Sequence, residues 1–162
     1  MHNLIQLDRV SAGYDGRNVL ENATLSIYEN DFLGVIGPNG GGKTTLMRVI
    51  LGLIEPTAGT VSYFDNGHPT SKIPMGYLPQ YNNIDRKFPI SVYDVVLSGL
   101  SCEKPLLRSF SKAQHEKTSE TLERMELISL AKRPIGALSG GQLQRVLLAR
   151  AIVSQPKVLI LD

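Results

Sequence analysis

The stretch "FLGVIGPNGGGKTTLMRVILGL", Phe32 to Leu53, decides the fold. Its first five residues form a continuous apolar run, which is typical of a strand buried on both faces. Six glycine-rich residues follow, and the remainder has apolar residues at helical spacing. The stretch therefore predicts a buried strand, a glycine loop and a helix in direct succession.

Within this stretch, "GPNGGGKT" matches the G-x-x-x-x-G-K-[ST] pattern of a phosphate-binding loop, in the strand-to-helix context that the pattern requires. Glycines let backbone N–H groups turn inward around phosphates, and the helix N-terminus adds partial positive charge. Lys43 is expected to reach the β and γ phosphates, and the Thr44 hydroxyl to bind Mg²⁺. Thr45 is interpreted as a helix-start residue. The predicted nucleotide-binding residues here are Gly37, Pro38, Asn39, Gly40, Gly41, Gly42, Lys43, Thr44 and Thr45.

The last residues, "KVLILD", read as a second buried strand that ends in a carboxylate, Asp162. In phosphate-loop NTPases a carboxylate at the end of a neighbouring strand holds the Mg²⁺ that the loop hydroxyl also contacts. Asp162 is therefore predicted as a metal ligand beside Thr44. The alternative, a helix N-cap or a plain terminal residue, would be favoured if the strand stood alone.

A second glycine-rich helix start occurs at "LSGGQ", Leu138 to Gln142. Ser139 and Gln142 have the spacing of a capping box, which accounts for the helix but not for two glycines in its first turn. Each glycine costs about 1 kcal/mol of helix stability relative to alanine, which suggests a need for exposed backbone. A bare helix N-terminus of this kind is a candidate anion site.

The remaining pattern predicts an α/β fold. "LIQLDRV" and "NATLSIY" alternate as two antiparallel strands, "TVSYF" and "MGYLP" are short strands, and "DNGHPTSKIP" is a surface loop. Helices are predicted from Ser91, from Ser111 with Gln114 in a capping box, and from Ser139. We expect one domain, with a P-loop NTPase core at 1–79 and 143–162 that includes an N-terminal antiparallel β subdomain, and an inserted helical subdomain at 80–142.

Composition excludes several classes of protein. The 162 residues carry 17 Lys and Arg against 15 Asp and Glu, a balance that does not indicate a nucleic-acid surface. No apolar run approaches the length of a membrane span, and no secretory signal precedes the first strand, so we expect a cytoplasmic protein. Cys102 is the only cysteine and is given no role.

The order of these motifs, with Gln80 directly after "YLP", resembles the ATP-binding cassette (ABC) family over essentially the whole chain. The resemblance implies an ATPase that uses ATP and Mg²⁺, with Lys43, Gln80 and Asp162 as catalytic residues. It implies that Gln80 joins Thr44 and Asp162 near the metal and the attacking water. It also implies that Tyr14, in "SAGYDG", stacks on adenine, although a lone loop tyrosine can simply pack on the surface.

The family resemblance also implies partners. Two cassettes pair head to tail, so Ser139, Gly140, Gly141 and Gln142 would close over ATP held by another copy. The segment "YNNIDRKFPISVYDVVLSGL" is similar to cassettes of bacterial importers of zinc, manganese or iron chelates, where it contacts the membrane permease. We therefore expect a transport ATPase on the inner face of the cell membrane, with no nucleic-acid partner.

The sequence departs from the family pattern at two places. Family members continue past the last strand with a glutamate that polarises water and, later, a histidine that senses the γ-phosphate, and neither is present. We expect a part of a longer, C-terminally incomplete cassette that binds Mg-ATP weakly, hydrolyses it very slowly and exposes apolar surface on "KVLIL". Gly41 replaces the usual serine or alanine, which is expected to loosen the loop slightly.

Other kinds of ABC protein are alternatives to a transport cassette. A chromosome or DNA-repair cassette needs a long coiled coil, and the segment between Lys43 and Leu138 has no sustained heptads. A translation-factor type needs a second copy of the motifs, which stays open. A non-catalytic module that uses ATP only to dimerise also stays open.

Overall fold

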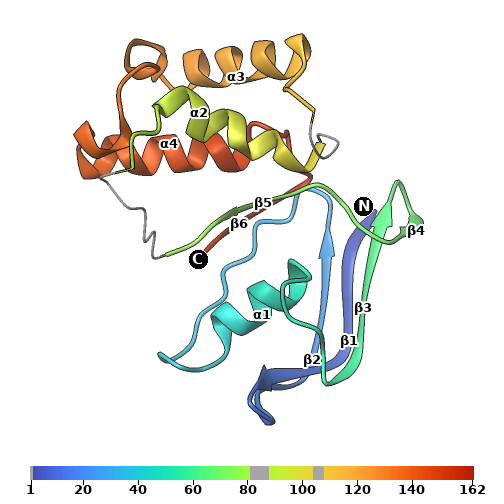
Figure 1. Cartoon of the computed structure of the whole chain (residues 1–162). Coiled ribbons are helices and arrows are strands. Elements are labelled where there is room, and N and C mark those ends of the chain that lie inside the picture. The colour runs from blue at the N-terminus through green and yellow to red at the C-terminus, as the bar shows by residue number, and fades with distance from the viewer. Residues whose placement is uncertain (1, 81–87, 104–107) are drawn as a thin grey trace. The chain divides into compact units, whose positions relative to one another are not determined.

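The computed structural model describes residues 2–80, 88–103 and 108–162 (Figure 1). These residues form two compact units: one comprises the chain up to Met75 together with Asp162, and the other spans Gly76 to Leu161. Each unit is described by itself. The predicted domain boundaries, with a helical subdomain at 80–142, differ from this division and stay a prediction.

The first unit is built on an antiparallel sheet with strand order β2-β1-β3-β4. Its strands are β1 (Asn3–Tyr14), β2 (Arg17–Tyr28), β3 (Ala58–Asp65) and β4 (His68–Thr70). β1 is an inner strand, and its side chains Ile5, Leu7, Val10 and Ala12 are fully buried. The predicted antiparallel pair is confirmed, whereas the surface loop predicted at 65–74 contains the short strand β4.

Two-residue turns close both hairpins of this sheet. Asp15–Gly16 joins β1 to β2, and Asn66–Gly67 joins β3 to β4. All four residues have positive φ, between 50° and 79°. Asp-Gly and Asn-Gly are the preferred pairs for such turns because aspartate and asparagine tolerate this conformation and glycine adopts it freely. The first turn fixes Tyr14 at the tip of a hairpin.

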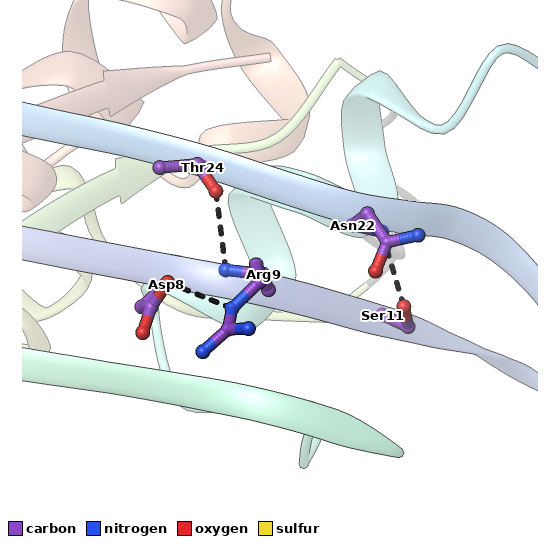
Figure 2. Close-up of polar contacts among 5 residues, drawn as sticks. All are labelled: Asp8, Arg9, Ser11, Asn22 and Thr24. Carbon is purple, nitrogen blue, oxygen red and sulfur yellow. Dashed lines mark hydrogen bonds and ion pairs between the residues drawn. The ribbon is translucent and has the colours of Figure 1, made fainter.

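The register of β1 against β2 shifts at several points, and side chains replace the ladder bonds that the shifts remove. Figure 2 shows Arg9 donating its backbone N–H to the Thr24 hydroxyl at 3.2 Å, and Asn22 donating its own to the Ser11 hydroxyl at 3.1 Å. Arg9 and Asn22 both have φ of 49°. The hydroxyls therefore satisfy backbone donors where the two strands bend.

The helix after the glycine loop is α1 (Lys43–Ile50). It is confirmed, though shorter than the predicted span to Leu53. Val49 and Ile50 are buried, and the Tyr63 hydroxyl on β3 donates to the Ile50 carbonyl at 3.0 Å. This bond satisfies one of the carbonyls that a helix leaves free at its C-terminus.

The predicted buried strand "FLGVI" is wrong for this structure. Residues 32–36 have no strand assignment, and Phe32 and Ile36 are 101% and 95% exposed. A strand is buried only when other strands flank it and other layers cover it. Within the described part of the first unit, all sheet pairing is among β1 to β4, so the apolar run has no such neighbours.

The second unit contains a small sheet and most of the helices. Strands β5 (Met75–Leu78) and β6 (Val158–Leu161) pair and run in the same direction (Figure 1). Between them come α2 (Val92–Leu97), η1 (Ser98–Glu103), α3 (Lys112–Arg124), η2 (Ile128–Leu130), η3 (Ile135–Ala137) and α4 (Gly140–Ile152). The three predicted helices are confirmed, and Ser111 and Ser139 form complete capping boxes.

The core of this unit lies where α2, α3 and α4 meet. Val92, Val96, Leu122, Leu127 and Val146 are fully buried there. Strand β6 is less covered than predicted, because Leu159 and Leu161 remain substantially exposed. This agrees with the expectation that "KVLIL" presents apolar surface.

Two glycines let backbone approach α4 closely near its C-terminal end. A Cβ on Gly76 of β5 would collide with the Ala151 carbonyl oxygen, and a Cβ on Gly99 of η1 would collide with that of Arg150. Both positions must be glycine for the strand and the 3₁₀ helix to reach the helix at this distance. Because glycine has no side chain, the backbones of β5 and η1 contact the backbone of α4 directly at these two positions.

Candidate functional site

The glycine loop wraps into a turn before α1. Gly40 and Gly42 have φ of 79° and 83°, and the Gly41 N–H donates to the Pro38 carbonyl at 3.1 Å. Gly42 is the N-cap of α1, and no side chain caps this helix. The first N–H groups of α1 are therefore without a side-chain partner at the loop, which is the arrangement that binds anions.

The loop is fixed against the sheet of the same unit at Gly42. This residue is buried, and a Cβ placed on it would lie 3.0 Å from the Val19 carbonyl oxygen. Val19 lies between Asn18 and Leu20, where the register of β2 against β1 shifts by one residue. The bulge brings the Val19 carbonyl to the loop, and glycine is the residue that leaves room for it.

Lys43 lies across the loop that precedes it. Its Nζ donates to the carbonyls of Gly37 at 2.9 Å and Pro38 at 2.7 Å. An ammonium group has three donors and no acceptor, so one donor remains beyond these two bonds. The arrangement concentrates positive charge at the loop together with the start of α1.

Thr44 and Asp162 lie side by side, although 118 positions separate them in the chain. The Thr44 hydroxyl donates to the Asp162 Oδ1 at 3.0 Å, and both side chains are half-buried. The structure therefore brings the predicted hydroxyl and carboxylate together. Two hard oxygen donors at hydrogen-bond distance suit a divalent cation such as Mg²⁺.

The neighbouring loop residues differ from this pair. Thr45 is only 5% exposed and turns into the unit, as expected for a helix-start residue. Pro38, Asn39 and Gly41 are exposed. A Cβ on Gly41 would lie 3.0 Å from the Pro38 carbonyl oxygen, so alanine would fit there only with a small shift of the loop.

Tyr14 ends β1 at the hairpin tip, with 43% of its surface exposed. Its hydroxyl accepts a hydrogen bond from Arg48 Nη1 at 3.0 Å, and Arg48 lies in the last turn of α1. The hydroxyl end of the phenol ring is therefore held by this hydrogen bond, while the rest of the ring remains accessible. Sequence reasoning did not identify Arg48, and the only signal for it was a cation five residues after Lys43.

Gln80 and the "LSGGQ" residues belong to the second unit. Gln80 is exposed and follows β5 and Pro79. Residues 81–87, where the predicted permease-contact segment begins, lie outside the described residues. The rest of that segment forms the approach to α2, α2 itself and the start of η1.

The start of α4 is an exposed helix end with a complete capping box. The Gln142 N–H donates to the Ser139 hydroxyl at 3.3 Å, and the Ser139 N–H donates to Gln142 Oε1 at 3.0 Å. Gly140 and Gly141 are exposed, and a Cβ at either would meet no atom within 4 Å. No packing among the described residues requires glycine here, and the predicted need for bare backbone stays a prediction.

An α/β arrangement with a glycine loop opening α1 and a carboxylate beside its threonine defines the P-loop NTPase fold. The ABC transporter family pattern matches residues 20–162. The chain belongs to this family, as the resemblance predicted.

Similar curated proteins are transport subunits. The chain is 40% identical over 160 residues to a probable metal transport system ATP-binding protein of Chlamydia trachomatis, covering 96% of this chain and 66% of that protein. It is 39% identical to the zinc uptake system ATP-binding protein ZurA of Listeria monocytogenes, covering 100% and 64%. It is 38% identical to the manganese transport system ATP-binding protein MntB of Bacillus subtilis, covering 98% and 63%. The chain thus spans slightly less than two thirds of these relatives.

Solved structures agree with the fold. A chain from an inward-facing ABC transporter described as metal-chelate type superposes with a TM-score of 0.85 at 30% identity, covering 100% of this chain and 60% of that one. A nucleotide-free ATP-binding cassette gives a TM-score of 0.78 at 25% identity, covering 99% and 68%. Membership of the family implies nucleotide binding.

The described residues contain no helix that is both long and apolar enough to span a bilayer.

Proposed function

We propose that the chain forms most of the ATP-binding subunit of an ABC importer for a divalent metal, zinc or manganese, or for an iron chelate. The relatives named above support transport over a translation-factor role or a dimerisation module. The subunit would lie in the cytoplasm, against the inner face of the membrane. ATP hydrolysis by the whole protein would drive transport.

The observation that carries the nucleotide part of this proposal is the Thr44–Asp162 contact at 3.0 Å beside Lys43. Thr44 and Asp162 would hold Mg²⁺, and by family resemblance Gln80 would join them. The bound ion would neutralise phosphate charge. Lys43 and the N–H groups at the start of α1 would bind the β and γ phosphates.

Magnesium dependence tests this assignment. Thr44→Ala and Asp162→Asn should each weaken ATP binding in Mg²⁺, because each removes an oxygen donor, and should leave binding in EDTA nearly unchanged. Isothermal titration calorimetry of the 162-residue chain measures both. Equal losses with and without Mg²⁺ would show that these residues bind the nucleotide itself or support the fold, and would refute the metal assignment.

The exposed "SGGQ" turn supports pairing of two chains. Because Gly140 and Gly141 meet nothing within 4 Å, another molecule could approach their backbone closely. Sedimentation velocity with Mg-ATP should show self-association that Ser139→Ala reduces. The same substitution should not change ATP affinity in dilute monomer. A loss of monomer affinity would mean that Ser139 contacts nucleotide within its own chain.

A permease contact is proposed at the approach to α2. An apolar cavity of about 310 Å³ lies there, lined by Phe88, Ile90, Val95, Ser98, Ile135, Leu147 and Arg150. Phe88 is exposed and sits at the start of the described part of the importer-like segment. Phe88→Ser in the whole transporter should reduce co-purification of the permease while ATP binding persists. Unchanged co-purification would count against this surface.

A further inference from the structure

Tyr14 and Arg48 connect the hairpin tip to α1 within one unit. Arg48 Nη1 donates to the Tyr14 hydroxyl at 3.0 Å, while the Tyr14 ring remains 43% exposed. A guanidinium is planar and holds its donors in fixed directions. The bond therefore restrains the tip of the phenol ring and leaves its face open to a ligand.

We propose that Arg48 is a positioning residue for nucleotide binding, holding the Tyr14 ring in the orientation that stacks on the base. This inference rests on the stacking role that the family resemblance implies for Tyr14, and it adds the residue that sets the direction of the ring. Arg48 need not touch the nucleotide. It acts through the Tyr14 hydroxyl.

The position of Arg48 on α1 supports the proposal. Lys43 opens this helix and Arg48 lies five residues later, an axial separation of about 7.5 Å. The same rigid helix thus begins at the phosphate-binding loop and orients the aromatic ring from its last turn. A restraint anchored on α1 fixes the ring relative to the phosphates, which a free hairpin tip could not do.

The hairpin is also held by contacts close to its tip, so the Arg48 bond acts on a limited motion. Thr57 Oγ1 contacts Asn18 Oδ1 at 2.9 Å and the Ser11 carbonyl at 3.0 Å. Val19 lies against Gly42 of the loop. With the strands fixed, the remaining freedom is rotation of the Tyr14 side chain about its two torsions, and the Arg48 bond limits that rotation.

The proposal separates base binding from phosphate binding. A stacked aromatic ring interacts with any base through its π-face, whereas inorganic tripolyphosphate has no base. Losing the restraint should weaken ATP and GTP alike and leave tripolyphosphate unaffected. A purely structural role for Arg48 would weaken all three.

The test measures affinities of the 162-residue chain for ATP, GTP and tripolyphosphate by calorimetry, in wild type, Arg48→Met, Arg48→Lys and Tyr14→Phe. Arg48→Met and Tyr14→Phe each remove the bond and keep the ring, so each should weaken ATP and GTP by roughly two- to tenfold, the usual worth of one hydrogen bond. Arg48→Lys should recover part of the loss because it retains a donor. The double variant should lose no more than either single one.

Arg124→Met is the matched control, because Arg124 is also an exposed arginine in the last turn of a helix, α3. It should change none of the three affinities. Circular dichroism melting of every variant checks that α1 and the sheet remain folded. Equal loss of ATP and tripolyphosphate in Arg48→Met would overturn the inference, as would additive losses in the double variant.

Tyr14→Ala distinguishes the positioning role of Arg48 from the stacking role of Tyr14 on which it depends. If Tyr14→Ala weakens ATP relative to tripolyphosphate but Arg48→Met does not, stacking stands and the positioning role of Arg48 is wrong. If Tyr14→Ala leaves that ratio unchanged, the stacking role fails and the inference fails with it. A wild-type chain that binds neither ATP nor tripolyphosphate would refute the phosphate loop itself.

Discussion

The chain has two glycine-rich helix starts, and they are built in opposite ways. In the loop before α1, Gly40 and Gly42 have positive φ. A Cβ added to Gly42 would lie 3.0 Å from the Val19 carbonyl oxygen. Before α4, Gly140 and Gly141 are surrounded by open space and Ser139 caps the helix. The difference shows that packing within the described residues constrains the loop before α1, whereas no such packing constrains the glycines before α4.

Among the substitutions that test this comparison, Lys43→Ala is expected to have the largest effect, a loss of ATP affinity. It removes the cation that is proposed to bind the β and γ phosphates. Charge-assisted bonds of this kind contribute about 1.5–3 kcal/mol, so ATP affinity should fall roughly 10- to 100-fold. Calorimetric titration of ATP measures it. Lys112→Ala is the matched control, since Lys112 is the first residue of α3 as Lys43 is of α1. Equal ATP affinity in wild type and Lys43→Ala would remove the loop from the site.

Gly42→Ala should come next. Its φ of 83° is unfavourable for alanine, and the new Cβ would press on the Val19 carbonyl, so the free energy of unfolding should fall by about 1–2 kcal/mol. Urea unfolding followed by circular dichroism measures the change. A variant as stable as wild type would show that the loop is not held against the sheet at this point.

Tyr63→Phe tests the other end of α1 and should cost about 1 kcal/mol, because the Ile50 carbonyl loses its donor. Burial also raises the pKa of the Tyr63 phenol above its ordinary value of 10.0. The folded state therefore keeps the proton longer than the unfolded state, and this contribution is fully present below pH 10 and is lost as pH rises through the raised pKa.

Unfolding of wild type and Tyr63→Phe at pH 9 and pH 11 measures this contribution. The stability of the wild type should fall more steeply than that of the variant over this interval. Parallel pH profiles would mean that the phenol ionises equally well in the folded and unfolded chain.

Gly140→Ala should have the smallest effect, and of opposite sign. Alanine meets no atom there and favours the helix, so the free energy of unfolding should rise by at most about 1 kcal/mol. Urea unfolding compares it directly with Gly42→Ala. Destabilisation by Gly140→Ala would mean that the two glycine turns are under the same steric constraint, and the contrast drawn above would be lost.

Local patterns predicted most of the fold. The sequence predicts both capping boxes, at Ser111 and Ser139, because a capping box depends only on two residues three positions apart. The Asp-Gly turn lies within an octapeptide already read as turn-rich. The prediction of a strand at 32–36 is wrong because the burial of a strand depends on neighbouring strands and covering layers, which a local sequence pattern does not contain.

In the candidate site, too, the residues that belong to a local motif could be predicted, and those that act through tertiary contacts could not. The loop residues follow a recognisable spacing, and Asp162 was found because its motif accompanies that loop. Their roles as ligands stay predictions. Arg48 and Val19 could not be identified, since one acts through a hydrogen bond between a helix and a hairpin and the other through a bulge. Neither has a sequence signature beyond its residue type.

The close approach of Gly76 and Gly99 to α4 limits how that helix can move. Sliding α4 by one residue, about 1.5 Å, would change which groups of the helix face Gly76 and Gly99, where the nearest atoms are the backbone carbonyl oxygens of Ala151 and Arg150. A displacement of α4 along its axis should therefore also displace β5 and η1.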